Sequence, residues 1–131
     1  MNREIKFRTW DFIDKKMINF FNPVFVKIEN SINFLFSNNF YDLWYSKCQR
    51  GSMDSKTFDI MQFTGLKDKQ GKEIYEGDII EFDKKEWGGN DNIHVVSWNN
   101  EVGSWSWGGG ITSDMEYRKV IGNIYENPEL L

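Results

Sequence analysis

The sequence predicts a mainly β protein, with a small antiparallel barrel or sandwich of SH3-like size in its C-terminal half. Aromatic residues make up 17% of the 131 residues, and alanine, the strongest helix former, is absent. Several segments alternate polar and apolar residues with the period of two that half-buried strands show. Short apolar segments also recur about every ten residues between turns rich in glycine and asparagine, as in small barrels. We therefore expect one domain over residues 1–131, with an N-terminal β-rich part at 1–58 and a C-terminal β-meander at 59–131.

The first elements predict a β-hairpin. Residues 5–10 alternate, with Ile5, Phe7 and Thr9 on one side, which is typical of a half-buried strand. Polar residues at 11–16 form the turn, and residues 17–20 form the returning strand.

The next region, residues 22–57, is the least informative part of the sequence. Apolar segments at 24–28 and 31–36 predict two more strands. The aromatic-rich segment 40–45 predicts a loop or a short helix that packs with the barrel.

A strand at residues 59–64 begins the C-terminal part, with Met61 and Phe63 on its inner face. Asp68 and Gly71 suit the first and fourth positions of a type I turn, because an aspartate carboxylate can accept from a backbone N–H two residues on. Gly77 is expected at a positive φ, where it turns the chain into a strand at 78–82.

Three more strands complete the predicted meander. They cover residues 93–98, 102–107 and 117–124, and the segments between them are rich in glycine and asparagine.

Composition excludes several classes of protein. The single cysteine, Cys48, cannot form an internal disulfide, and with the single histidine, His94, it cannot make a Cys/His zinc cluster. Nothing around either residue marks a nucleophilic Cys–His pair. We expect no cofactor and no enzymatic activity.

The charge balance and the hydropathy indicate which partners and which cellular location to expect. Sixteen basic and 20 acidic residues give a net charge of −4. This charge disfavours a protein that binds nucleic acid mainly by neutralising the phosphate backbone, although a local basic patch is compatible with a negative net charge. No apolar run approaches the roughly 20 residues that span a bilayer, and the N-terminus lacks the pattern of a signal peptide. We expect a cytoplasmic protein that does not contact membranes.

Three blocks, at residues 5–18, 61–80 and 120–131, carry a resemblance to a known family. They include Ile5-Lys-Phe-Arg-Thr-Trp-Asp, Met61-Gln-Phe-Thr-Gly-Leu-Lys-Asp-Lys-Gln-Gly-Lys and Val120-Ile-Gly-Asn-Ile-Tyr-Glu-Asn-Pro. In order and spacing these blocks resemble the YopX family of phage and prophage proteins from Gram-positive bacteria. The resemblance implies a mainly β fold, a phage or prophage origin and a bacterial cytoplasmic setting. It brings no established activity, cofactor or catalytic residue.

The turn residues within these blocks are interpreted first as structure, because each stands where a turn or a close backbone approach is expected. They are Gly65, Gly71, Gly77, Asp78 and Gly122. Three carboxylates near one corner, Glu73, Glu76 and Asp78, give the alternative of a Mg²⁺ site for hydrolysis. Asp78 is equally suited to accept hydrogen bonds from backbone N–H groups.

The tryptophans form the most distinctive pattern. Trp105 and Trp107 lie on one face of an extended strand, and Trp98 on the preceding strand can pair with them. We favour a role in the core or in a subunit interface. The alternative is a platform that stacks bases or captures a peptide, with Lys84 and Lys85 nearby.

These observations predict a phage or prophage accessory protein that binds other proteins without catalysis. A homo-oligomer is expected, and a phage or host protein is a further possible partner, because aromatic-rich surfaces favour interfaces. The alternative is a single-stranded nucleic-acid-binding module that uses the tryptophan face, and a metal-dependent hydrolase is a remote third hypothesis.

Overall fold

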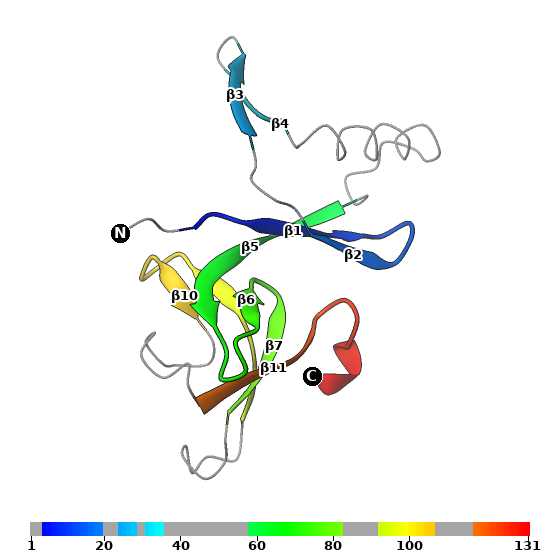
Figure 1. The fold of residues 1–131 in the computed structure, drawn as a ribbon, viewed down its shortest axis with the longest axis vertical. Coiled ribbons are helices and arrows are strands. Elements are labelled where there is room, and N and C mark those ends of the chain that lie inside the picture. The colour runs from blue at the N-terminus through cyan, green and yellow to red at the C-terminus, as the bar shows by residue number, and fades with distance from the viewer. Residues whose placement is uncertain (1–3, 20–23, 29–30, 36–57, 83–91, 107–116) are drawn as a thin grey trace. The chain divides into compact units, whose positions relative to one another are not determined.

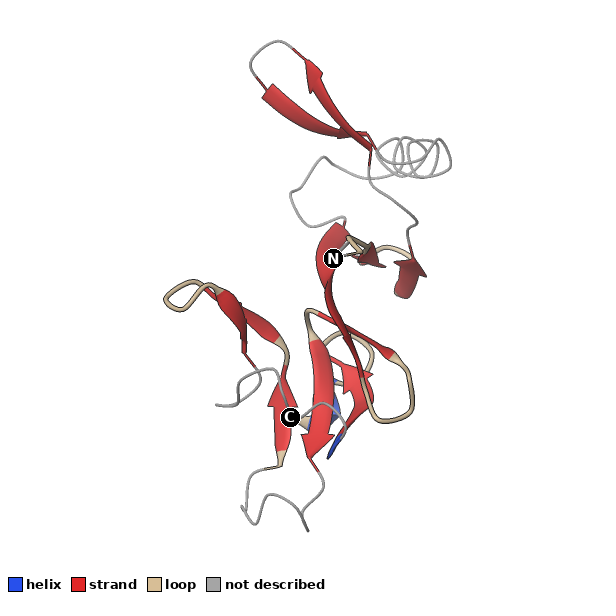
Figure 2. Ribbon diagram, turned by 60° about the vertical axis from the view of Figure 1, so that its left-hand side comes forward, coloured by secondary structure: helices blue, strands red, loops and turns tan. Residues whose placement is uncertain are grey.

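The computed structural model describes residues 4–19, 24–28, 31–35, 58–82, 92–106 and 117–131 (Figure 1). The predicted fold class is confirmed: the protein is mainly β, with a curled antiparallel half-barrel sheet and further sheets. A short 3₁₀ helix lies at Pro128–Leu130, and strands joined by turns make up most of the described ranges (Figure 2).

The chain divides into two units. The N-terminal unit comprises Ile5–Ile60, and the C-terminal unit comprises Met61–Leu131 together with Met1–Glu4. That the two units form one domain stays a prediction.

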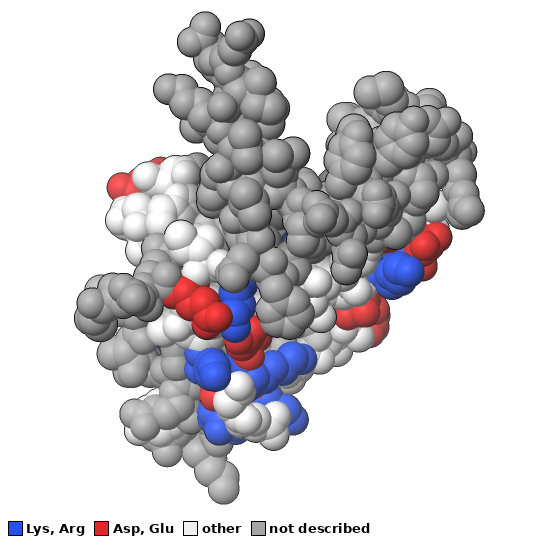
Figure 3. Space-filling view, turned by 45° about the horizontal axis from the view of Figure 1, so that its top comes forward, with Lys and Arg blue, Asp and Glu red and all other residues white. Residues whose placement is uncertain are grey.

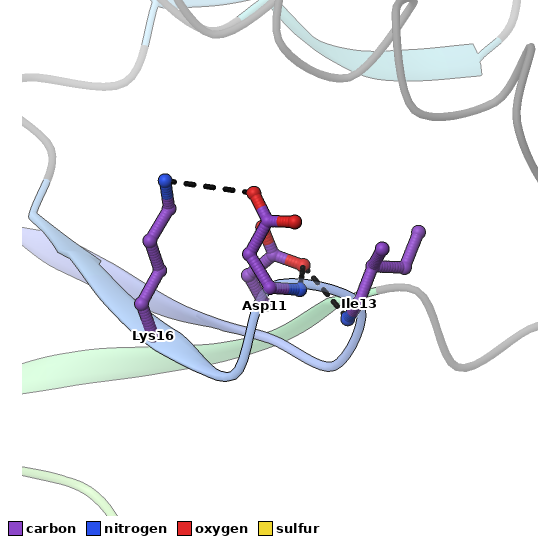
Figure 4. Close-up of polar contacts among 4 residues, drawn as sticks. Asp11, Ile13 and Lys16 are labelled. Carbon is purple, nitrogen blue, oxygen red and sulfur yellow. Dashed lines mark hydrogen bonds and ion pairs between the residues drawn. The ribbon is translucent and has the colours of Figure 1, made fainter.

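The predicted first hairpin is confirmed in the N-terminal unit. Strands β1 (Phe7–Asp11) and β2 (Lys16–Asn19) pair antiparallel. The Asp11 carboxylate starts the turn, because its Oδ1 accepts from the backbone N–H of Ile13 at 2.9 Å and of Asp14 at 3.1 Å (Figure 4). Lys16 Nζ lies 3.6 Å from the Asp14 carboxylate beside it.

The predicted one-sided burial of β1 is wrong, because Arg8, Thr9 and Trp10 are all buried. A polar side chain tolerates burial when it is hydrogen-bonded. The Thr9 hydroxyl meets this condition by donating to the carbonyl of Asp59 at 2.7 Å.

A second hairpin follows in the same unit, as predicted. Strands β3 (Val24–Ile28) and β4 (Ser31–Leu35) pair antiparallel in a two-stranded sheet. The loop or short helix predicted over 40–45 lies outside the described residues.

The described residues after β4 form seven strands. They are β5 (Phe58–Lys67), β6 (Glu73–Tyr75), β7 (Asp78–Phe82), β8 (Ile93–Val95), β9 (Ser97–Asn99), β10 (Ser104–Ser106) and β11 (Arg118–Asn123). The strand orders are β2-β1-β5-β6, β11-β7-β8 and β10-β9, and β5 begins in the N-terminal unit before it pairs with β6.

Two of the differences between predicted and observed strand limits have a visible cause. The strand predicted at 93–98 is divided at Val96, whose backbone bonds to the corner before β7: its N–H donates to Asp78 O and its carbonyl accepts from Gly77 N–H, both at 2.8 Å. The strand predicted at 102–107 begins only at Ser104, because the two residues before it belong to the turn.

The core of the C-terminal unit combines residues from most of its strands. It comprises Ile74, Ile80, Phe82, Val96, Trp105 and Val120, with Leu66 packed against it. Ile121 and Ile124 of the C-terminal block are half-buried. A bulge between Val120 and Gly122 interrupts the alternation of β11, and Ile124 follows its last residue.

Arg118 is a buried cation at the margin of this core. Its side chain is fully buried, and its guanidinium carbon lies 4.3 Å from the centre of the Phe82 ring, opposite which it stands in the β7–β11 register. This is the distance of a cation–π contact.

Candidate functional site

The turn between β5 and β6 is held by one buried carboxylate. Asp68 Oδ1 accepts from the backbone N–H of Gln70 at 2.8 Å and of Lys72 at 2.9 Å, and Gly71 N–H donates to the Asp68 carbonyl at 2.9 Å. The predicted turn is therefore confirmed. The second oxygen, Oδ2, accepts from Val120 N–H at 2.9 Å, a contact between residues 52 positions apart.

These bonds control the charge of Asp68. Burial of the carboxylate raises its pKa, but the hydrogen bonds from Val120, Lys72 and Gln70, together with the Lys72 charge, outweigh burial and hold the pKa below its ordinary value of 3.8. The ionised carboxylate therefore joins the turn to β11.

The corner before β7 depends on Gly77 and Asp78. Gly77 has a φ of +78°, as predicted, and its N–H and carbonyl bond to Val96 and to Ile124. Asp78 is 1% exposed, and its Oδ2 accepts from Tyr75 N–H at 2.8 Å. This carboxylate stabilises the corner from within.

The three carboxylates of the hydrolase hypothesis are not brought together as metal ligands. The described residues include no group of three or more His, Cys, Asp or Glu side chains that could hold a metal ion. Glu73 Oε2 accepts from the Tyr75 hydroxyl at 2.9 Å, while Glu76 uses its backbone N–H to bond to Gln62.

Gly122 permits a close approach in the C-terminal block. A Cβ at this position would lie 2.5 Å from Asn127 Oδ1 and 2.8 Å from Asn127 Cβ. Asn123 N–H donates to that same Oδ1 at 3.4 Å, and Asn127 N–H donates to the Asn123 carbonyl at 2.9 Å. The other glycines of the prediction, Gly65 and Gly71, have φ values of +87° and +81°.

Together these turns cover the outer edge of β11. The carbonyl of Arg118 accepts from Lys69 N–H at 3.0 Å, Val120 N–H is bound by Asp68, and Asn123 N–H is bound by Asn127. An edge whose polar groups are bonded within the chain is closed to another strand. The blocks at 61–80 and 120–131 therefore contribute to the scaffold.

A different surface is presented by β9, β10 and the turn between them, residues Ser97–Ser106, which we call the Trp hairpin. Trp98 and Trp105 are direct cross-strand partners, and their rings meet edge to face with centres 5.1 Å apart and planes at 78°. The prediction that Trp98 pairs with this row is confirmed.

The two rings differ in exposure. Trp105 is 8% exposed and belongs to the core, whereas Trp98 is 42% exposed. Val102 in the turn is 69% exposed, and Gly103 N–H closes the turn by donating to the Asn99 carbonyl at 2.9 Å. One indole therefore anchors the hairpin and the other is presented to solvent.

Several sequence-predicted site residues lie outside the described residues. These are Trp107, Lys84 and Lys85 from the aromatic platform hypothesis, and Cys48. His94 is half-buried and meets the Phe82 ring edge to face, with ring centres 5.1 Å apart.

The family model described as "YopX protein" matches residues 6–131, which is nearly the whole chain. The chain belongs to the YopX family. A comparison with curated proteins finds no match.

Among solved structures, this YopX chain is similar to protein EF1440 from Enterococcus faecalis. The two share 26% sequence identity, the match covers 99% of each chain, and the TM-score is 0.62. No helix in the described ranges of the YopX chain is long and apolar enough to cross a bilayer.

Sequence reasoning missed one surface of the YopX chain. Exposed lysines flank Asp68 on the β5–β6 turn, and Tyr117, just before β11, is 42% exposed. Three lysines within six residues, at 67–72, were the available signal. What the sequence did not reveal is that this turn bonds to β11, where Lys69 N–H donates to the carbonyl of Arg118, the residue after Tyr117.

Proposed function

We propose that this YopX-family protein is a phage- or prophage-encoded accessory protein that works in the bacterial cytoplasm by binding proteins, copies of itself included, without catalysis. The observation that carries the proposal is the solvent-exposed Trp98, which is held against the core residue Trp105. The Trp hairpin is the contact surface in this proposal.

The geometry of Trp98 suits an interface. Tryptophan dominates binding energy at many protein interfaces because it buries a large area with few rotatable bonds. The edge-to-face contact with Trp105 restrains Trp98 before any partner arrives. A restrained ring loses less conformational entropy on binding, so more of its burial contributes to affinity.

The partner that we propose for the Trp hairpin is a second copy of the chain. Two hairpins related by a two-fold axis would each cover the apolar surface of the other, here Trp98 and Val102. A ten-residue hairpin offers less area than the roughly 800 Å² that each partner contributes to a standard interface. The expected dimer is therefore weak and concentration-dependent.

The charge of the hairpin favours protein over nucleic acid at this surface. Glu101, which is exposed, is the one charged residue of the segment Ser97–Ser106. A carboxylate in the turn next to Trp98 repels phosphate, and Lys84 and Lys85, which would have to offset it, lie outside the described residues.

Sedimentation velocity over micromolar to near-millimolar concentrations tests the proposal. The wild-type protein should shift from monomer to dimer as concentration rises, and Trp98→Ala should weaken the dimer by roughly tenfold or more. Because Trp98 is 42% exposed and lies outside the core cluster, the melting temperature of the variant should stay close to that of the wild type.

Tyr117→Ala is the matched control, since Tyr117 is also an aromatic residue of the C-terminal unit and is also 42% exposed. It should leave the dimer unchanged. A wild-type protein that stays monomeric at every concentration rejects self-association, and equal weakening by both variants rejects the Trp hairpin as its site.

A further inference from the structure

Four lysines gather around the turn between β5 and β6, and we call them the lysine surface. Lys67, Lys69 and Lys72 are exposed, and Lys119 on β11 is half-buried. The bond from Lys69 N–H to the Arg118 carbonyl brings the turn next to Lys119. Figure 3 shows Lys and Arg atoms gathered on one part of the face in view, with fewer Asp and Glu atoms among them. This local excess of positive charge stands in a chain whose net charge is −4.

The carboxylates around this surface reduce its positive charge, and their oxygens already accept hydrogen bonds within the fold. Asp68 is 6% exposed and accepts three backbone N–H groups. Glu73, across from Lys67 in the β5–β6 register, accepts the Tyr75 hydroxyl. Glu81, across from Lys119, is half-buried and accepts from Asn92 at 3.4 Å.

An exposed aromatic ring adjoins the lysines. Tyr117 is 42% exposed and directly precedes β11, and the buried Arg118 alone separates it from Lys119 along the chain. A ring beside a row of cations is the combination that binds single-stranded nucleic acid, with bases stacked on the ring and phosphates held by the lysines.

The turn itself is rigid enough to hold these groups in place. Both oxygens of Asp68 and the backbone bonds of Lys69 and Gly71 fix its path against β11. Cations that project from a fixed turn need less ordering when they bind than cations on a mobile loop.

We propose that the lysine surface, together with Tyr117, binds the sugar-phosphate backbone of single-stranded nucleic acid without base specificity. Lysine binds phosphate as a point charge, whereas base recognition commonly uses arginine, and the two arginines of the described residues, Arg8 and Arg118, are both buried. The exposed ring favours nucleic acid over an acidic peptide, because each base offers a stacking face. This surface is separate from the Trp hairpin, so the two proposals stand or fall independently.

Fluorescence anisotropy with labelled oligo(dT) at low salt tests the proposal on the full chain. The triple variant K67Q/K69Q/K119Q should bind at least tenfold more weakly. Its plot of log affinity against log salt concentration should be shallower by about 2, since each lost phosphate contact removes about 0.7 from the slope for a single strand. Lys72 is kept because its charge supports the ionised Asp68.

Two controls distinguish binding at the lysine surface from a non-specific effect of charge and from binding at the Trp hairpin. K15Q/K16Q changes two lysines at the β1–β2 turn and should alter affinity less than twofold. Tyr117→Ala should weaken oligo(dT) binding about fivefold or more through lost stacking, whereas Trp98→Ala should leave it unchanged.

Three outcomes would overturn the proposal. The first is no oligo(dT) binding by the wild type at low salt. The second is binding that the triple variant retains although its melting temperature matches the wild type. The third is displacement of oligo(dT) by poly-glutamate of equal charge at the same concentration, which would assign the surface to acidic protein segments instead.

Discussion

The turn at Asp68 and the turn of the Trp hairpin use the same local device. In each, a side-chain oxygen at the first position accepts backbone N–H groups from the residues that follow: Asp68 Oδ1 accepts from Gln70, and Asn99 Oδ1 accepts from Glu101, at 2.8 and 2.9 Å. Each turn also ends at a glycine of positive φ, which is Gly71 in one and Gly103 in the other.

The difference lies in what the first residue reaches beyond its own turn. Asp68 has a second oxygen that binds Val120 N–H on a distant strand, whereas Asn99 Oδ1 accepts hydrogen bonds from Glu101 and Val102, within its own turn. The first turn is thereby built into the scaffold, whereas the second exposes Glu101 and Val102 to solvent. Two long-range hydrogen bonds, from Val120 N–H to Asp68 Oδ2 and from Lys69 N–H to the Arg118 carbonyl, attach the first turn to β11.

The largest expected effect separates the two tryptophans of the hairpin. Trp105→Ala should lower the free energy of unfolding by about 3–5 kcal/mol, because it empties a core position. Trp98→Ala should cost less than about 1 kcal/mol, since its ring is 42% exposed. Urea denaturation followed by circular dichroism measures both. If both variants lost a similar amount of unfolding free energy, Trp98 would belong to the core, and the two tryptophans would not differ in role.

Asp68→Ala is the next largest change and compares the turns directly. It leaves three backbone N–H groups without their acceptor, Val120 among them in the interior, and should cost about 2–4 kcal/mol. Asn99→Ala, the equivalent change in the hairpin turn, should cost about 0.5–1 kcal/mol, the loss of a local cap.

Asp68→Asn refines this comparison. An asparagine can still offer one oxygen to Gln70 and Lys72, but its amide N–H₂ then faces Val120 N–H. The stability of the Asp68→Asn variant should be intermediate between that of the wild type and that of Asp68→Ala. An unaffected Asp68→Asn protein would argue that the bond to Val120 contributes little.

The sequence predicted the local features of this fold better than its long-range ones. The Asp68 turn, the positive φ of Gly77 and the hairpin pairs follow from turn chemistry and from periods of two, which act over a few residues. The break at Val96 and the bulge of β11 were not predicted. Both depend on hydrogen bonds to parts of the chain that local patterns do not identify.

The same limit applies to the candidate sites. The pairing of Trp98 with Trp105 follows from strand spacing, but their unequal burial depends on which face meets the core. The lysine surface was missed because Lys69 and Lys119 are brought together only by the bond between the turn and β11. Surfaces assembled from distant segments need the tertiary contacts to be recognised.

Gly77→Ala should have an intermediate effect of about 1–2 kcal/mol. Alanine is strained at a φ of +78°, and its Cβ would also lie 3.4 Å from Ile124 Cδ1 and Met61 Sδ. Gly103→Ala in the hairpin turn has a φ of +64° and nothing within 4 Å, so it should cost about 1 kcal/mol from strain alone. Thermal melting of the two variants checks this order, and a larger loss at Gly103 would contradict it.

A smaller effect is expected from acid. Because folding lowers the pKa of Asp68, its ionised form adds stability above its unfolded pKa of about 4, and this contribution is lost as pH falls through the lower folded pKa. Asp68→Asn lacks this titration, so its stability should decline less steeply than that of the wild type below about pH 4. Urea midpoints measured across this range test the sign, and parallel declines would show that Asp68 titrates alike in both states.

Trp105→Phe should change the free energy of unfolding least, and the sign of that change is informative. Trp105 Nε1 is buried and has no hydrogen-bond partner in the part of the chain that the structure describes. A buried donor without an acceptor costs about 1–3 kcal/mol, and its removal offsets the smaller apolar area of phenylalanine. We therefore expect a change within about 1 kcal/mol of zero, with the ring contact to Trp98 retained. A loss as large as that of Trp105→Ala would show that the indole N–H, and not the apolar ring, anchors the hairpin, and the presentation of Trp98 would then depend on a polar contact.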